Sequence, residues 1–204
     1  MIGSYNVGHA RSQVVKRGRD SRLANLLGAV SIGISDGMYE STAMAAGLDG
    51  VASAALIALL DFMPGGSVRT LSQVVGLTHS GAVRVVDRLV ADGLVSRGSS
   101  DDARSRSIKL TARGVKVARD VRAARERVVS DVFEKFTASE RATLTTLCER
   151  LVAGITEQRL ETRSAGETPA GGALCRMCDF GACRREIGMC PAAHTVAKFS
   201  AGRP

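Results

Sequence analysis

Residues 70–95 restrict the fold more than any other stretch, because they contain two short helical runs joined by a tight turn. In the first run Leu71 and Val74 fall three residues apart, so they share one face of a helix. Gly76 follows, and glycine readily adopts the left-handed conformation that ends a helix. Thr78 is then a good N-cap for a second helix. Two short helices joined in this way indicate a helix-turn-helix unit.

The second helix separates apolar from polar residues. Its apolar positions recur at three and four residues and are expected to face a core: Ala82, Val85, Val86 and Leu89. The remaining positions are largely polar or basic and are left facing outward: His79, Ser80, Gly81, Val83, Arg84, Asp87 and Arg88. A helix that presents such groups along its N-terminal half suits the major groove of DNA. We therefore predict that this helix contacts double-stranded DNA.

Two short strands are expected after the second helix, which ends at Gly93. Residues 94–97 and 107–110 have strand character, and the segment between them is strongly polar. This pattern predicts a β-hairpin wing. Arg104 and Arg106 lie at the end of its loop, where they are expected to enter a minor groove with its negative potential. The alternative is an ordinary solvated hairpin.

Long helices are expected on both sides of this unit. Helical periodicity covers residues 21–46 before it, where Leu23, Val30 and Met44 belong to an apolar stripe that is expected to be mainly buried. It also covers residues 48–63, for which Asp49 is a plausible N-cap.

The helices after the unit are marked by their caps. Thr111 caps a helix through roughly Phe136. Thr137 and Glu140 form a capping box that starts a last helix through about Arg163. These helices carry more apolar surface than a small winged unit can cover, so we expect a homodimer built from them.

Composition supports a mostly α protein that binds a polyanion. Only 3% of residues are aromatic and Trp is absent, which favours packed helices over an aromatic-rich sheet sandwich. The net charge of +8 favours a phosphate-rich partner. Residues 23–34 are apolar enough to imitate a signal-peptide core, but Asn25 and Ser31 interrupt them, so we expect a cytoplasmic protein without membrane contact. No catalytic constellation is evident, and we expect no enzyme activity.

From about Leu23 to Arg163 the chain resembles the MarR family of bacterial transcription regulators. The resemblance rests on LSQVVGLTHSGAVRVVDRLVADGLVSR and on the wing run DDARSRSIKLTARG. It implies an entwined homodimer, with two winged lobes that bind a pseudo-palindromic operator, usually to repress, and a pocket for a small-molecule effector. It also implies that Asp102 supports the wing while Arg104 and Arg106 reach DNA. The implied recognition surface comprises Thr78, His79, Ser80, Val83, Arg84 and Arg88.

Two positions depart from the family pattern. Gly81 stands where Thr, Pro or a similar residue is common, and Val83 replaces a frequent Ser or Thr. Both departures bear on which bases are recognised rather than on whether DNA is bound.

A cysteine-rich tail follows the part that resembles the family. Within CRMCDFGACRREIGMCPAAH, two, four and six residues separate the successive cysteines, so that four of the five cysteines of the chain lie within sixteen residues. A Cys-x2-Cys turn presents two thiolates to one metal, and Gly181 and Gly188 let the chain bend back to supply others. The predicted metal ligands are Cys175, Cys178, Cys183 and Cys190, or three of these thiolates with His194.

Several chemistries fit this cluster. A structural zinc ion suits four close thiolates in a small tail without a core of its own. An iron-sulfur cluster is the alternative that the closing Cys190-Pro191 favours, although the spacing differs from ferredoxins. Thiol-disulfide sensing, plain disulfides and inert thiols remain open. Cys148, alone on a helix, is expected to be a small buried hydrophobe.

The predicted fold is mostly α (α+β), a winged helix-turn-helix with long flanking dimerisation helices and a small cysteine-rich C-terminal tail. Two alternative functions are also compatible with the sequence: a metal or redox (iron-sulfur) sensor on a winged fold, and a winged-helix module for protein association that does not bind DNA. The predicted parts are a basic arm at 1–22, a MarR-like unit at 23–163 with its winged helix at about 48–112 and its dimerisation helices at 21–46 and 112–163, a linker at 164–174 and the cysteine-rich tail at 175–204.

Overall fold

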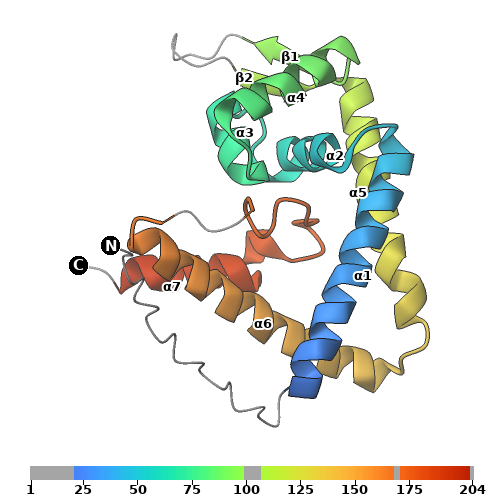
Figure 1. The fold of residues 1–204 in the computed structure, drawn as a ribbon, viewed down its shortest axis with the longest axis vertical. Helices are drawn as coiled ribbons and strands as arrows, with labels where there is room; N and C mark the ends of the chain where they lie inside the picture. Colours follow the sequence, from blue (N-terminus) through green and yellow to red (C-terminus); the bar gives the residue numbers. More distant parts are fainter. Residues whose placement is uncertain (1–20, 99–106, 168–170, 203–204) are drawn as a thin grey trace, which may run out of the picture.

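The computed structural model describes residues 21–98, 107–167 and 171–202. It contains helices α1 (Ser21–Ala46), α2 (Gly50–Ile57), α3 (Val68–Val75), α4 (His79–Ala91), α5 (Ala112–Phe133), α6 (Ala138–Ser164) and α7 (Pro191–Ala201), the π-helical turn η1 (Ala58–Phe62), the 3-10 turn η2 (Arg185–Ile187) and strands β1 (Val95–Gly98) and β2 (Ser107–Leu110). Figure 1 shows α1 and α5 side by side, a small head above them and α6 leading away below. The head consists of α2, η1, α3, α4, β1 and β2.

The head holds the main hydrophobic core. Leu56 from α2, Leu71 from α3 and Leu89 from α4 are fully inaccessible to solvent, as is Ile108 from β2. The same cluster includes Ala118, one turn and a half into α5. Because four elements of the head and α5 all contribute, the head is a rigid support for its outer surface.

Side-chain caps fix where the helices begin. The carboxylate of Asp49 accepts a hydrogen bond from the Ala52 amide at 2.9 Å, and the hydroxyl of Thr78 accepts one from the Gly81 amide at 3.1 Å. Thr137 caps α6 through a complete capping box. All three caps were predicted, and α1 occupies the predicted range of residues 21–46. Local hydrogen bonding therefore sets these starts, as the sequence indicates.

Several helix bounds differ from the predictions. The helix expected over residues 48–63 is α2 followed by the π turn η1. The first helix of the helix-turn-helix begins at Val68, because Ser67 accepts the Thr70 amide at 3.1 Å and so acts as its cap. α5 ends at Phe133 rather than near Phe136, because the chain turns there to enter the next helix.

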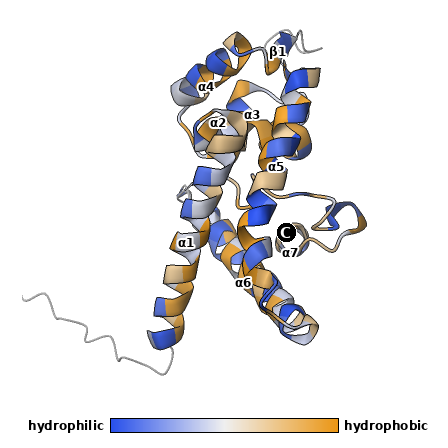
Figure 2. Cartoon of the chain, turned by 90° about the vertical axis from the view of Figure 1, so that its right-hand side faces the viewer, coloured by the Kyte–Doolittle hydropathy of each residue, from blue (hydrophilic) through white to orange (hydrophobic). Residues whose placement is uncertain are grey.

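The apolar stripe expected to be buried along α1 is largely exposed in the single chain. Leu23 is 64% exposed, Val30 53% and Met44 79%. The reason is that α1 packs against α5 and the start of α2, which leaves most of its circumference uncovered. Figure 2 shows hydrophobic residues on the surfaces of both α1 and α6. The prediction that this stripe is buried is therefore wrong for a single protomer.

The wing hairpin has the expected topology. β1 pairs antiparallel with β2, with Val95 opposite Leu110 and Gly98 opposite Ser107. The amide of Ile108 also donates to the carbonyl of Gly66 at 2.9 Å, which ties the hairpin to the loop before α3. The second strand of the hairpin is therefore attached to the head.

The tail contains a helix that the sequence analysis did not predict. α7 begins with Pro191 at its first position, directly after Cys190, and packs against α6. Proline favours that position because its missing N–H has no partner to lose there. Among the described residues, no single helix is both long and apolar enough to cross a membrane; α1 and the α2–η1 segment pass that test only when joined across a bend of 79°.

Candidate functional site

The α4 helix, which we call the recognition helix, is held by its apolar face. Ala82, Val86 and Leu89 are fully buried in the head. Gly76 has φ of 75°, so the chain reverses sharply between α3 and α4 as predicted. The helix therefore has one face fixed in the core and the other available to a partner.

The predicted contact residues on the recognition helix lie on its accessible side. Val83 and Gly81 are both half-buried. The others are exposed: Thr78, His79, Ser80, Arg84 and Arg88. The structure thus brings the predicted set together on one surface, although its contacts with DNA stay a prediction.

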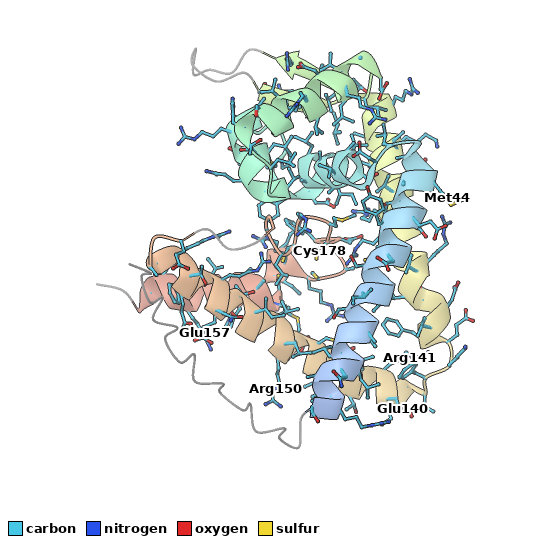
Figure 3. All side chains as sticks on the ribbon, in the orientation of Figure 1. Met44, Glu140, Arg141, Arg150, Glu157 and Cys178 are labelled. Carbon is cyan, nitrogen blue, oxygen red and sulfur yellow. The ribbon has the colours of Figure 1, made fainter. Side chains whose placement is uncertain are left out.

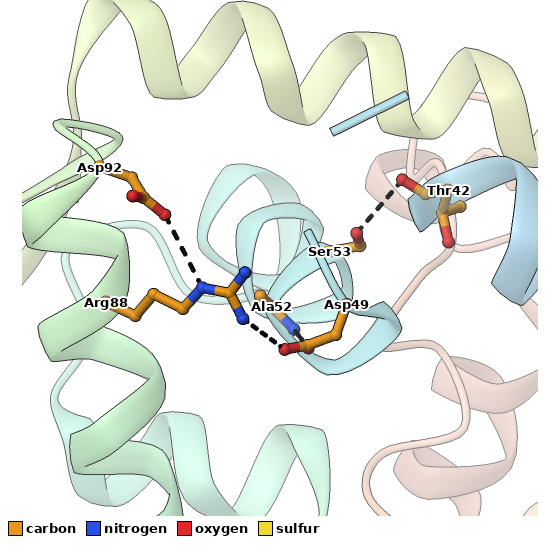
Figure 4. Close-up of polar contacts among 6 residues, drawn as sticks. All are labelled: Thr42, Asp49, Ala52, Ser53, Arg88 and Asp92. Carbon is orange, nitrogen blue, oxygen red and sulfur yellow. Dashed lines mark hydrogen bonds and ion pairs between the residues drawn. The ribbon is translucent and has the colours of Figure 1, made fainter. Parts of the chain in front are cut away.

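Arg88 has a structural role that the sequence did not reveal. Its guanidinium donates to the Asp49 carboxylate at 2.9 Å and lies 3.9 Å from that of Asp92 (Figure 4). Asp49 also caps α2, so the pair links the recognition helix to the start of α2. Half of the Arg88 side chain remains exposed. Because two carboxylates hold it, Arg88 is less available to phosphate than Arg84.

Arg97 was not among the predicted contact residues. This β1 residue forms an ion pair with Asp87 on the outer face of the recognition helix. The pair joins the wing to the helix and places a second cation beside it. Opposite charges ten residues apart were the available signal, but their pairing depends on the hairpin geometry, which periodicity alone does not give.

Three predicted wing residues cannot be placed. Asp102, Arg104 and Arg106 fall in residues 99–106, outside the described residues, and most of the predicted basic arm at 1–22 also lies outside them. Their roles stay predictions.

The cysteine cluster lies between the head and α6, where Cys178 is labelled in Figure 3. Cys175 and Cys190 are buried, while Cys178 and Cys183 are half-buried. The thiol of Cys178 is in hydrogen-bonding contact with those of Cys175 and Cys183. All five cysteines of the chain are free thiols in this structure. Three of the four predicted ligands are thus in contact with one another, and the binding of a metal by them stays a prediction.

Contacts within the cluster make its thiols unequal. The hydrogen bond that Cys175 donates to Cys178 is the main cause that lowers the pKa of Cys178 to about 6, and the positive charge of Arg125 acts in the same direction. The same hydrogen bond and burial raise the pKa of Cys175. Burial also raises the pKa of Cys183. Cys178 is therefore the thiol of this cluster that loses its proton most readily, and Cys175 and Cys183 donate hydrogen bonds to it.

Cysteine thiolates are suitable ligands for a thiophilic metal, but in this structure the cysteine side chains are not arranged around a common centre. Among the described residues no group of three or more His, Cys, Asp or Glu side chains is placed to hold a metal ion. The imidazole of His194 belongs to an exposed residue on α7. Metal binding would thus require the thiols to draw closer together.

Cys148 is a correction to the sequence analysis. It was expected to be a buried hydrophobe, yet it is exposed on α6. The helix places it at a hollow of about 700 Å³ between α6 and the tail, lined also by Val152, Cys183 and Met189. Its exposure follows from the sparse cover that α6 receives in one protomer.

The cysteine loop, residues 175–190, is anchored to the head and to α5. Arg122 on α5 donates to the Asp61 carboxylate at 3.0 Å and lies 3.2 Å from that of Asp179 in the loop. All three side chains are at least three-quarters buried. Such a shared, partly desolvated arginine is a stronger link than a surface ion pair.

An aromatic contact anchors the same loop. The ring of Phe180 lies against that of Phe62 in η1, with centroids 5.7 Å apart. The guanidinium of Arg185 lies over both rings, 4.5 Å from the centroid of Phe180. Next to this stack, between α6, α7 and the tail, is a cavity of about 210 Å³ whose mainly apolar lining also includes Arg159 and Leu160.

Comparisons with known proteins agree with this geometry. Residues 46–105 match the sequence model of the MarR family. A MarR family protein from Bacillus stearothermophilus is 24% identical, with a TM-score of 0.60 over 67% of this chain and 94% of that one. MarR from E. coli without ligand is 21% identical, with a TM-score of 0.52 over 63% of this chain and 96% of that one.

A solved complex with DNA is among the similar structures. A mutant of S. aureus MepR bound to an oligodeoxyribonucleotide is 12% identical, with a TM-score of 0.50 over 65% of this chain and 97% of that one. A search of curated proteins gave no match. The mostly helical chain with its two-stranded sheet therefore has the winged-helix fold of the MarR transcriptional regulators.

Proposed function

We propose that this protein is a transcriptional regulator that binds double-stranded DNA through the recognition helix α4 and the wing. The observation that carries the proposal is the exposed surface at the start of α4, where His79, Ser80 and Arg84 lie together on a helix fixed by its buried face. An exposed helix N-terminal half of this kind fits the major groove. The net charge of +8 favours the approach to phosphates.

DNA binding is tested by selecting duplexes from a random pool and measuring affinity over a range of salt concentrations. We expect sequence-selective binding that weakens as salt rises, because bound phosphates release counterions. Arg84→Ala and Arg104→Ala are expected to weaken binding, each by about 1–3 kcal/mol if the contact is to a base. Arg150→Ala on α6, well away from the head in Figure 3, removes the same charge and serves as control. If the wild-type protein and all three variants bound the selected DNA with equal affinity, the proposed interface would be refuted.

We also propose a homodimer that binds a pseudo-palindromic operator and represses transcription. Leu23 and Leu27 on α1 and Leu147 and Leu151 on α6 are between 42% and 64% exposed, which is costly for large apolar side chains that lack a partner. A twofold axis through these helices would present two recognition helices to two half-sites. Light scattering should give twice the chain mass of 21.4 kDa, and Leu151→Glu should shift the mass toward the monomer. Transcription in vitro from a template with the operator across the promoter should fall as protein is added.

The cysteine loop is proposed to bind a metal ion, with zinc favoured over an iron-sulfur cluster. Four thiols lie within a sixteen-residue span, and three of them are in contact, because Cys178 touches both Cys175 and Cys183. Zinc favours such thiolate sets and would replace thiol protons. Metal and sulfide per chain, measured on anaerobically purified protein, separate the options. One zinc and no sulfide supports the proposal, iron with sulfide supports the alternative cluster, and metal-free protein of full stability refutes both.

A small-molecule effector is proposed to bind the 210 Å³ cavity between α6, α7 and the tail. The cavity is mainly apolar and has Arg159, Arg163 and Arg185 at its wall, which suits a small organic anion. Thermal-shift screening with such anions, followed by DNA release, tests it. A hit that stabilises wild-type protein and Leu160→Trp equally would place the site elsewhere.

A further inference from the structure

The tail forms a bridge between α6 and the helix-turn-helix. The amide of Ala173 donates a hydrogen bond to the carbonyl of Val74 at the end of α3, at 2.7 Å. From the other side, Arg159 on α6 donates to the carbonyl of Gly172, also at 2.7 Å. Figure 1 shows the tail in the angle between the head and α6. Two consecutive tail residues are therefore held by both parts of the protein.

The contact of the tail with α3 is made by backbone atoms on both sides. A Cβ atom added to Gly172 would lie 2.0 Å from the carbonyl oxygen of Val74 and 2.6 Å from the amide nitrogen of Gly76. Gly76 has the left-handed conformation that ends α3, and Thr78 then caps the recognition helix. The tail is thus packed directly against the turn that positions the recognition helix.

Both hydrogen bonds of the bridge satisfy carbonyl groups that would otherwise lack a donor. The last carbonyls of a helix have no partner within the helix, and Ala173 supplies the donor for Val74. Gly172 is buried, so its carbonyl would lose its arginine donor at a cost if Arg159 turned away. Loss of the Arg159 bond would therefore weaken the hold of the tail on α3.

The cavity of about 210 Å³ between α6, α7 and the tail lies directly beside this bridge. Its wall includes Arg159 and Ala173, which are the two hydrogen-bond donors of the bridge. Its wall also includes Phe62 of the head and Arg185, whose guanidinium lies 5.7 Å from the centroid of the Phe62 ring. A molecule in this cavity would therefore touch the residues that join the tail to the head.

The charge of the cavity wall favours an anion. Arg159, Arg163 and Arg185 line it, and none of the described residues that line it is acidic. A carboxylate is negatively charged and can accept two parallel hydrogen bonds from one guanidinium, whereas a peptide carbonyl is neutral. A bound carboxylate is thus a stronger partner for Arg159 than the carbonyl of Gly172.

We propose that a small carboxylate with an apolar body binds in this cavity, takes Arg159 from the carbonyl of Gly172 and so releases the tail from α3. The inference rests on the DNA binding and the effector site proposed above, and it assigns the route from that site to the recognition helix. In the ligand-free protein the tail restrains the turn between α3 and α4. Once the tail is released, DNA binding must supply the ordering that the tail no longer provides, so operator binding weakens.

The test compares octanoate with octanol, which has the same chain length but no charge, on full-length protein and selected DNA. Saturating octanoate should weaken operator binding on the order of tenfold, whereas octanol should have little effect. Operator DNA should in turn weaken octanoate binding by the same factor, because the coupling is reciprocal. Hydrogen exchange at the Ala173 amide should accelerate when octanoate binds, because that amide loses the Val74 carbonyl.

Two arginine variants separate ligand binding from release of the tail. Arg159→Ala removes the bond to Gly172, so the ligand-free variant should bind DNA on the order of tenfold more weakly than wild type, and octanoate should weaken it no further. Arg163→Ala lies at the same cavity and should bind octanoate more weakly. At saturation, however, octanoate should lower the DNA affinity of Arg163→Ala by the wild-type factor.

A pair of glycine variants tests the docking of the tail without any ligand. Gly172→Ala should weaken DNA binding, because its methyl group displaces the tail from α3. Gly202→Ala in the same tail is the control. Its added Cβ would meet the carbonyl of Lys198 at 3.6 Å, an ordinary contact, so its DNA affinity should stay unchanged.

The outcomes distinguish this inference from the proposals on which it rests. If the wild-type protein shows no sequence-selective DNA binding, the proposed function fails and this inference fails with it. If octanoate does not stabilise the protein against heat, the effector site and this inference are refuted while DNA binding stands. Three results refute this inference alone: bound octanoate that leaves operator affinity unchanged, an equal response of Arg159→Ala and wild type, or wild-type DNA affinity in Gly172→Ala.

Discussion

The ion pairs of Arg122 make a quantitative prediction about how firmly the cysteine loop is attached. Arg122 lies 3.0 Å from one carboxylate oxygen of Asp61 and 3.2 Å from one of Asp179. Its side chain is 25% exposed, and each carboxylate side chain is 20% exposed. Arg122→Ala would leave two largely desolvated carboxylates facing each other without a counter-charge.

Removal of one partner from a fully buried pair costs about 3–5 kcal/mol. The residual exposure of these three groups calls for a discount, so we expect Arg122→Ala to lower the free energy of unfolding by about 2 kcal/mol. Asp179→Asn should cost less, because Asp61 still pairs with the arginine. The double variant should then reveal a coupling of about 1 kcal/mol between Arg122 and Asp179.

The assay is urea unfolding of the four proteins of this cycle at one fixed protomer concentration, because a dimer gains stability with concentration. Lys116 and Asp120, an exposed pair on α5 at 2.8 Å, form the matched control cycle. Their coupling should be near 0.3–0.5 kcal/mol. A coupling between Arg122 and Asp179 no larger than the control would refute the claim that this arginine attaches the loop.

Three further substitutions test the first turns of α5 and α6. Gly114→Ala would place a Cβ 1.8 Å from the carbonyl oxygen of Leu94, so the free energy of unfolding should fall by about 1–3 kcal/mol or more. Gly154→Ala is the control, because nothing lies within 4 Å of its added Cβ and it should not destabilise the protein. Thermal melts of the two variants measure the difference. Thr137→Ala should cost about 1 kcal/mol at neutral pH. The backbone amide of Thr137 lowers the pKa of Glu140, so the stability that Glu140 contributes is present above its unfolded value of about 4.3 and is lost as pH falls through the folded value. The stability difference between wild-type protein and Glu140→Gln should therefore shrink in acid.

Local signals sufficed where a structural feature depends on neighbours in sequence. Thr78, Thr137 and Gly76 each act within one helical turn, and the structure confirms all three. The bounds of β1 and β2 also agree with the two predicted strands to within one residue. Such features are encoded by side chains that bond their own segment.

Features that depend on distant partners were missed. The pairing of Arg88 with Asp49 joins residues 39 positions apart, and Arg122 bridges two segments that are far from it in sequence. The burial expected along α1 and at Cys148 failed for the same reason, since exposure depends on which elements cover a face. Helical periodicity identifies an apolar face but does not say what packs on it.

The tail contains features that local sequence predicts and features that it does not. Cys178 contacts Cys175, as their Cys-x2-Cys spacing favours, and it also contacts Cys183, whereas metal binding by these thiols stays a prediction. Helix α7 was not predicted, although Pro191 at its start and the alanines after it are ordinary helix signals. The docking of Gly172 on α3 could not be foreseen, because it depends on tertiary contact between segments almost a hundred residues apart.

Hydroxyl-radical footprinting on the selected operator tests the central claim of DNA recognition most directly. A homodimer that uses two copies of the recognition helix should protect two patches on one face of the duplex, with centres about 10 base pairs apart or a multiple of that. Arg84→Ala should weaken both patches together, since each protomer supplies the same arginine. Protection that is uniform along the DNA, or two patches that Arg84→Ala leaves unchanged, would contradict recognition through α4.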